Sequence, residues 1–181
     1  PGGRRVLAFH TDADLPEVLA LRRELIPETN TRHDVRALDL TSPHWWEQVD
    51  LPRRRHGRPV FLFAEGVLMY LEPQQVQAVL ATFYERAPAG SVLAFDAMCW
   101  LGVGRAAQHP SVRATGAEFR WGLRSPADLT RGHPRLRLDS TYRVLEGFGL
   151  PYTLFAPLVL MLLGVPLYAV YALRATDGAD T

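Results

Sequence analysis

The sequence predicts an α/β fold, with a mostly parallel sheet and helices on both of its faces. Short runs that are apolar throughout alternate with segments whose apolar residues recur at helical spacing. This pattern is typical of strands buried on both faces and of the helices that cover them. The composition, 48% hydrophobic and 22% charged over 181 residues, indicates a globular chain, and the length suits one domain over residues 1–181.

The first two predicted strands are each followed by a helix. Residues 6–11 (VLAFHT) form an apolar run that leads into acidic residues, and Pro16 then stands where the first turn of a helix tolerates proline. A second strand is expected over residues 34–38. After it, Ser42 and Pro43 favour the start of a short helix over residues 44–49.

The central part of the chain repeats this pattern with stronger signals. Residues 59–64 (PVFLFA) form an apolar strand that Glu65 and Gly66 interrupt. Residues 91–95 form the next apolar strand, after Gly90. The helix between them opens at a proline and has an inward face of four apolar residues, namely Val76, Val79, Leu80 and Phe83.

Acidic residues recur at or just after the predicted strand ends, at Asp14, Asp39, Glu65 and Asp96. In parallel sheets the ligand lies beyond the carboxyl ends of the strands. Four acids in the same topological place therefore predict a pocket along one edge. The alternative interpretation of each acid is a helix cap or a solvated loop residue.

The second half of the chain is less regular. Residues 98–135 contain glycines and prolines and are expected to form a lid or a connecting insert. Within them, residues 125–128 (SPAD) resemble a capping box that opens a short helix. Leu136 and Leu138 alternate with arginines as they would in a strand.

An uncharged stretch over residues 148–173 has two interpretations. Its length is enough to cross a bilayer, so a membrane-associated protein held by this stretch is one alternative. Pro151, Pro157, Pro166 and internal glycines divide it, however, and proline interrupts helices. A buried apolar helix followed by a buried strand over residues 148–174 is therefore favoured over a membrane span.

Charge and single-residue chemistry narrow the classes of function. The 20 basic and 19 acidic residues give a formal net charge of +1, so no nucleic-acid partner is predicted. The basic run Arg53-Arg54-Arg55-His56 is interpreted as a solvated loop. Cys99, the single cysteine, is expected to be a small buried residue and fits a reducing, cytoplasmic location. The six histidines have no ligand spacing, so no metal is predicted and no catalytic residue is assigned.

Several segments together resemble the leucine carboxyl methyltransferase family, which includes tetracenomycin-type polyketide O-methyltransferases. Residues 63–71 (FAEGVLMYL) resemble its most recognisable signature, and residues 14–18 (DLPEV) with their continuation to residue 27 resemble its second motif. Further segments fall in family order: residues 39–40 (DL), 45–46 (WW), 95–96 (FD), 119–122 (FRWG) and 125–126 (SP). The resemblance covers residues 1–130, and the agreement of several motifs in order makes it specific.

The resemblance implies a Rossmann-like sheet that binds S-adenosylmethionine and transfers its methyl group to a carboxylate or hydroxyl of a small-molecule acceptor. By similarity, Asp14 would take the ribose hydroxyls, with Asp12 as the competing candidate. Asp39 would accept a hydrogen bond from the adenine amino group, while Leu40 packs on the ring. Glu65 would face the amino group of the methionine moiety.

The other implications are less specific. Met69 and Tyr70 either line the acceptor side or belong to the core. The resemblance does not indicate the oligomeric state.

The glycine-rich loop of the family, which follows its first strand, has no counterpart here. Gly2 and Gly3 are too short a remnant, and the Gly102-x-Gly104 segment comes too late in the chain. The domain is therefore expected to be truncated at its N-terminus and to lack the first strand of the sheet, which would leave unpaired edges. A non-catalytic Rossmann-like remnant or fragment that binds no cofactor is accordingly the second alternative.

Overall fold

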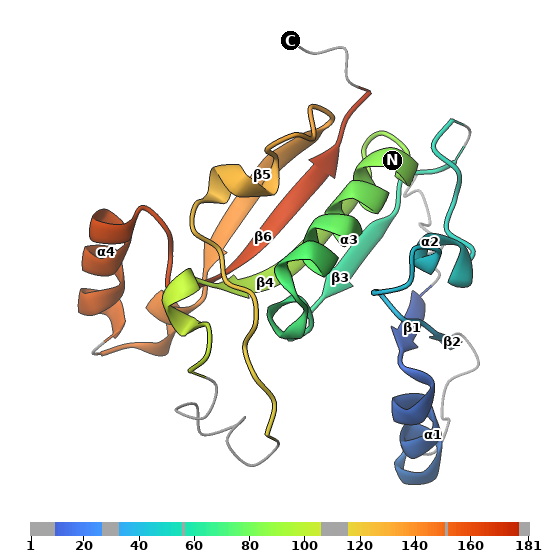
Figure 1. Ribbon diagram of the computed structural model, residues 1–181, viewed down its shortest axis with the longest axis horizontal. Coiled ribbons are helices and arrows are strands. Elements are labelled where there is room, and N and C mark those ends of the chain that lie inside the picture. Colours follow the sequence, from blue (N-terminus) through green and yellow to red (C-terminus); the bar gives the residue numbers. More distant parts are fainter. Residues whose placement is uncertain (1–9, 27–32, 56, 106–115, 151, 178–181) are drawn as a thin grey trace, which may run out of the picture. The chain divides into compact units, whose positions relative to one another are not determined.

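The computed structural model describes residues 10–26, 33–55, 57–105, 116–150 and 152–177. These residues form two compact units, unit 1 over residues 1–51 and unit 2 over residues 52–181 (Figure 1). The described strands make two sheets, one of two strands and one of four.

Unit 1 is built on two parallel strands, β1 (His10–Asp14) and β2 (His33–Ala37). Helix α1 (Pro16–Leu25) follows β1 and has its proline in the first turn, as the sequence predicts. The short helix α2 (Trp45–Gln48) follows β2 and buries both of its tryptophans. Residues 6–9 of the first predicted strand lie outside the described residues.

The sheet of unit 2 has the order β3-β4-β6-β5. Its strands are β3 (Phe61–Ala64), β4 (Val92–Met98), β5 (Leu136–Arg143) and β6 (Tyr168–Ala175). Strands β3 and β4 are parallel, whereas β6 pairs antiparallel with both β4 and β5. Three strands therefore run in one direction and only β6 is reversed, which gives a mixed sheet.

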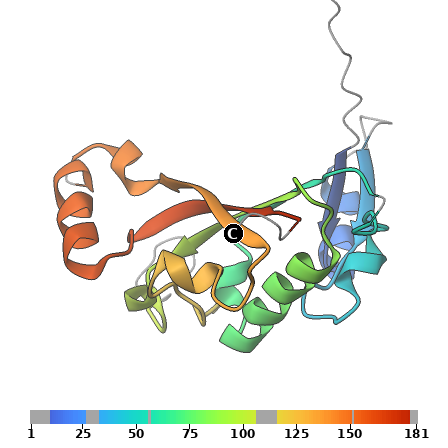
Figure 2. The ribbon, with the colours of Figure 1, turned by 90° about the horizontal axis from the view of Figure 1, so that it is seen from above.

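Helix α3 (Pro73–Arg86) covers one face of this sheet (Figure 2). All four residues of its predicted inward face, from Val76 to Phe83, are at most 2% exposed, which confirms the prediction from helical spacing. A capping box between Glu72 and Gln75 fixes the start of α3. Near its other end, the buried guanidinium of Arg135 donates to the carbonyl oxygens of Tyr84 and Ala87.

Short 3₁₀ helices connect the strands of unit 2. They are η1 (Leu68–Tyr70), η2 (Trp100–Gly102), η4 (Pro126–Leu129) and η5 (Leu145–Phe148). The capping box expected over residues 125–128 is present: the Ser125 hydroxyl accepts from the Ala127 amide, and the Asp128 carboxylate accepts from the Ser125 amide. Residues 106–115 of the predicted lid lie outside the described residues.

The apolar stretch of the C-terminal region forms helix α4 (Tyr152–Leu163) and then β6. The expected burial of the helix is wrong: Ala156 and Val159 are buried, but Leu154 and Met161 are each 75% exposed. Because α4 is apolar nearly all round, the sequence pattern does not define an inward face. None of the helices within the described residues is long and apolar enough to cross a membrane.

Candidate functional site

The carboxyl edge of the sheet in unit 1 carries Asp14 and Asp39. Asp14 is the last residue of β1, and its backbone oxygen accepts from the Leu38 amide at 2.8 Å. This bond holds the end of β2 beside Asp14, as expected where parallel strands finish at one edge. The structure therefore places Asp14 and Asp39 at the same edge of this sheet.

The two candidate carboxylates at the end of β1 have different surroundings. Asp12 forms an ion pair with Arg22 across 2.8 Å. Asp14 is exposed, and its Oδ1 accepts from the Leu15 amide at 2.8 Å. Within the described residues Asp14 has no cationic partner, so its second oxygen is available to hydroxyl donors. The geometry favours Asp14 over Asp12 as the carboxylate that meets a ligand.

Asp39 organises the turn that follows β2. Its Oδ1 accepts from the Thr41 amide at 2.8 Å and from the Thr41 hydroxyl at 2.7 Å. These hydrogen bonds stabilise the ionised form and lower the pKa of Asp39. Leu40, between the two residues, is half-buried. Asp39 is thus both a turn-forming residue and an ionised acceptor.

In unit 2 the corresponding acidic residue is Glu65, which directly follows β3 and is exposed. The next residue, Gly66, has a φ of 63°, a conformation that glycine adopts readily. Its amide donates to Asp96 Oδ1 at 2.7 Å. The carboxylate of Asp96 therefore fixes the turn that presents Glu65.

Asp96 lies within the sheet rather than at its edge, because β4 continues to Met98. Only 1% of Asp96 is exposed. Its second oxygen accepts from the Tyr168 hydroxyl at 2.5 Å. The expectation that Asp96 gathers with the other acids at the strand ends is therefore wrong, since its carboxylate is buried and has protein donors on both oxygens.

Tyr168 is the residue that sequence reasoning missed. Burial, above all, raises its pKa, and the hydrogen bond to Asp96 and the negative charges of Asp96 and Glu65 act in the same direction. Tyr168 lies 72 residues beyond Asp96 in the chain. No local signal joins the two, and only the pairing of β6 with β4 brings them together.

The remaining sequence candidates behave as structural residues. Met69 is 5% exposed and packs with Phe119, and the rings of Tyr70 and Phe119 lie 5.5 Å apart. The core interpretation of Met69 is thus confirmed. Cys99 is a buried free cysteine, as expected. Within the part of the chain that the structure describes, no group of three or more His, Cys, Asp or Glu residues is placed to hold a metal ion.

Comparison with known proteins gives one family. The family model of leucine carboxyl methyltransferase matches residues 10–84. The tetracenomycin polyketide synthesis O-methyltransferase TcmP of Streptomyces glaucescens is 33% identical over 135 residues, which are 75% of this chain and 47% of TcmP. The chain thus spans about half the length of this relative.

Solved structures agree on the fold. A putative methyltransferase from Thermobifida fusca superposes with a TM-score of 0.58 at 18% identity, over 92% of this chain and 63% of that one. An S-adenosylmethionine-dependent methyltransferase from Mesorhizobium loti gives a TM-score of 0.55 at 12% identity, over 92% and 81% of the two chains. The predicted α/β class, with the Rossmann-like fold of these methyltransferases, is confirmed.

Proposed function

Because this chain belongs to the leucine carboxyl methyltransferase family, we propose that it serves the transfer of a methyl group from S-adenosylmethionine to a carboxylate or hydroxyl oxygen of a small molecule. The match over residues 10–84 supports this proposal, as does the relative TcmP, whose name describes an O-methyltransferase of polyketide synthesis. The match includes Asp14, Asp39 and Glu65, the three acidic residues proposed for the cofactor.

The observation that carries the proposal is the pair of ionisable side chains at one edge of unit 1. Asp14 is exposed, and its second carboxylate oxygen has no donor among the described residues, which suits the paired hydroxyls of a ribose. Asp39 has a lowered pKa and remains an acceptor at neutral pH, which suits an adenine amino group, with Leu40 against the ring. These residues fit the adenosyl part of the cofactor.

Glu65 is proposed for the ammonium group of the methionine moiety. It is an exposed carboxylate directly after β3, and the Gly66–Asp96 hydrogen bond holds its turn in place. Opposite charges and charge-assisted hydrogen bonds favour such a pairing. Asp96 then acts as a positioning residue, because its carboxylate accepts from the Gly66 amide of that turn, and Tyr168 acts through its hydrogen bond to Asp96.

Methyl transfer depends more on the position of the acceptor oxygen than on proton transfer. When bound, S-adenosylmethionine supplies a methyl group on a positively charged sulfur, and the acceptor oxygen must be held in line with it. A carboxylate acceptor is already ionised at about pH 7 and needs no base. Tyr168, with its raised pKa, keeps its proton at neutral pH and therefore acts as a donor and not as a general base.

The experiment that tests this function is a calorimetric titration of the 181-residue chain with S-adenosylhomocysteine. We expect saturable binding, and we expect Asp14→Asn to weaken it by about tenfold or more, since a charge-assisted hydrogen bond is lost. The matched control is Asp12→Asn. It removes the same charge at a position two residues before Asp14, from a carboxylate that already forms an ion pair with Arg22. This control should bind like the wild type.

Two outcomes would contradict the proposal. If the wild-type chain gives no binding heat at millimolar ligand, this chain does not bind the cofactor, and the alternative of a non-catalytic Rossmann-like module is supported. If Asp12→Asn weakens binding as much as Asp14→Asn does, the assignment of Asp14 to the ribose is wrong. A Glu65→Gln variant tests the methionine side of the site in the same assay.

A further inference from the structure

Unit 2 contains a pocket whose lining includes none of the residues proposed above for the cofactor. Its volume is about 570 Å³, within the range of small-molecule sites. The wall is formed by the start of α3, the segment after β4 and residues 120–131. The residues that line it include two tryptophans and three arginines, namely Trp100, Trp121, Arg120, Arg124 and Arg131.

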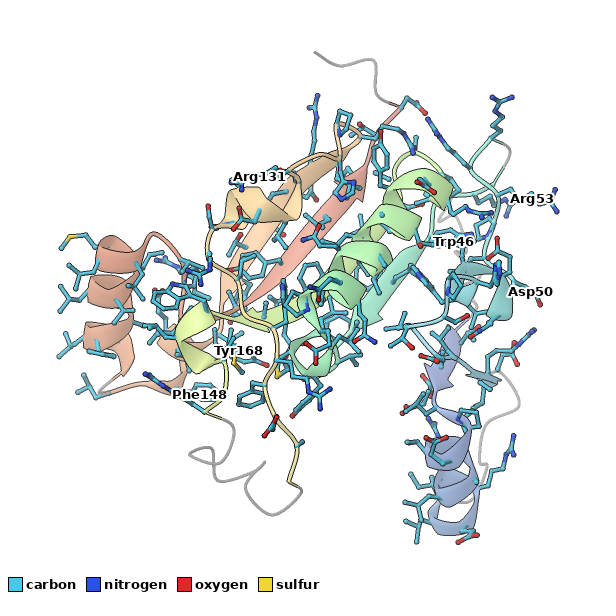
Figure 3. The ribbon with its side chains drawn as sticks, viewed as in Figure 1. Trp46, Asp50, Arg53, Arg131, Phe148 and Tyr168 are labelled. Atoms are coloured by element: carbon cyan, nitrogen blue, oxygen red, sulfur yellow. The ribbon has the colours of Figure 1, made fainter. Side chains whose placement is uncertain are left out.

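This pocket lies on the opposite face of the sheet from the Asp96–Tyr168 pair. The ring of Trp121 packs against Phe95, with 6.3 Å between the ring centroids. Phe95 and Asp96 are consecutive in β4, so their side chains point to opposite faces. Figure 3 labels Arg131 beside η4 and Tyr168 at the start of β6. The pocket is therefore separate from the Asp96–Tyr168 pair.

The three arginines of the pocket differ in their partners. Arg120 forms an ion pair with Glu72 at 3.3 Å, and Arg131 pairs with Asp128 at 2.8 Å. Arg124 has no carboxylate partner among the described residues. Its guanidinium carbon lies 5.0 Å from the centroid of the Trp100 ring. A guanidinium over an aromatic ring still has its N–H donors at its edges, where a planar anion can accept two of them.

We propose that this pocket binds a planar organic anion of the aromatic carboxylate class. The carboxylate accepts from Arg124, and the flat ring of the ligand packs on the indole surfaces of Trp100 and Trp121. Two features of the pocket carry this assignment. The exposed guanidinium of Arg124 has no carboxylate partner among the described residues and can pair with a negative charge, and the two tryptophans favour an apolar ring over a hydrated ion such as phosphate.

The test is a titration of the ¹⁵N-labelled full chain with 2-naphthoate, and in parallel with 2-naphthamide, a neutral ligand of nearly the same shape. The indole N–H resonances of the four tryptophans report where the ligand binds. We expect saturable shifts for Trp100 and Trp121, none for Trp45 and Trp46 in unit 1, and about tenfold weaker binding of the amide. Neither measurement needs the methyl donor, so the result is independent of the proposed function.

A pair of charge-matched variants tests the role of Arg124. We expect Arg124→Gln to weaken 2-naphthoate binding by about tenfold. The control is Arg53→Gln, because Arg53 is an exposed arginine of unit 2 that does not line the pocket. This control should bind like the wild type.

Three results would overturn the proposal. The first is equal affinity for the acid and the amide. The second is a shift confined to Trp45 and Trp46, and the third is the absence of saturation at millimolar ligand. The first comparison uses the wild-type chain alone, so it holds even if a substitution disturbs folding.

Discussion

Asp96 and Tyr168 illustrate how a buried charge is accommodated at the scale of single residues. The Asp96 carboxylate accepts from a backbone amide and from a tyrosine hydroxyl, and these donors replace the water that it loses on burial. Tyr171 lies on the opposite face of β6 from Tyr168 and is a buried polar side chain whose lost water is not replaced. It is fully buried, and its hydroxyl has no hydrogen-bond partner within the described residues.

Tyr171 makes the stability of the protein sensitive to alkaline pH. Burial raises the pKa of its hydroxyl from the ordinary value of 10.0 to about 12. The folded state therefore holds this proton more tightly than the unfolded chain does. Its contribution to stability is complete below about pH 10 and is lost as the pH rises towards about 12, by up to about 2–3 kcal/mol. All 20 basic residues are arginines, so no lysine titrates in this range.

We expect Tyr171→Phe to reduce the loss of unfolding free energy between about pH 8 and about pH 11, measured by urea denaturation. In this variant the unfolding free energy still decreases with pH, but less steeply, because the pKa of Tyr168 is also raised. The control is Tyr142→Phe, since Tyr142 is 68% exposed on β5. If Tyr171→Phe and Tyr142→Phe change the slope equally, Tyr171 is not buried in solution.

At the scale of elements, the segment 119–124 is held against the end of β4. The Leu123 amide donates to the Met98 oxygen at 2.8 Å, and the Trp100 amide donates to the Leu123 oxygen at 3.0 Å. Gly122 lies at this contact. A Cβ there would be 2.8 Å from the Cys99 oxygen and 2.9 Å from the Trp100 Cα, and these backbone atoms have little freedom to move.

We expect Gly122→Ala to lower the unfolding free energy by about 1–3 kcal/mol, because the added methyl group overpacks this contact. The matched control is Gly147→Ala, where an added Cβ meets no described atom within 4 Å. Chemical denaturation of both variants measures the difference. Equal stability of the two would show that segment 119–124 is not held against β4. The same physical argument explains the glycine in the FRWG segment of the family resemblance.

At the scale of the whole molecule, the two units differ in the size of their cores. The buried apolar residues of unit 1 within the described ranges are Leu19, Trp45 and Trp46. Unit 2 contains all the other buried apolar residues of the described chain, including the four on α3. A small core stabilises weakly, so local opening should be easier in unit 1.

We expect the amides of α1 to exchange with deuterium faster than those of α3, because α1 buries one residue and α3 buries four. Hydrogen exchange followed by mass spectrometry of peptides from the two helices measures this order. Added denaturant should reduce the difference in exchange rate between α1 and α3, because global unfolding then begins to dominate exchange in both helices. Equal protection in the absence of denaturant would instead mean that the two units open as one cooperative body.

Much of the fold could be predicted from local pattern. The α/β class, the inward face of α3 and the capping box at Ser125 depend on residues within a few positions of one another, so their spacing is visible in the sequence. The same holds for Asp14, Asp39 and Glu65, which occur at or just after short apolar runs. Their roles towards a cofactor stay a prediction that rests on the family resemblance and on their position at or just after the strand ends.

Other features were decided only by the tertiary structure. The reversal of β6 and the pairing of Asp96 with Tyr168 depend on the register between strands far apart in the chain. The exposure of α4 depends on what packs against it, which a helix apolar on all sides does not reveal. The pocket that contains Arg124 is lined by residues from α3, from the segment after β4 and from the connection before β5. Local sequence determines which elements form, whereas long-range packing determines which side chains meet, because contact energies depend on neighbours that the local pattern does not contain.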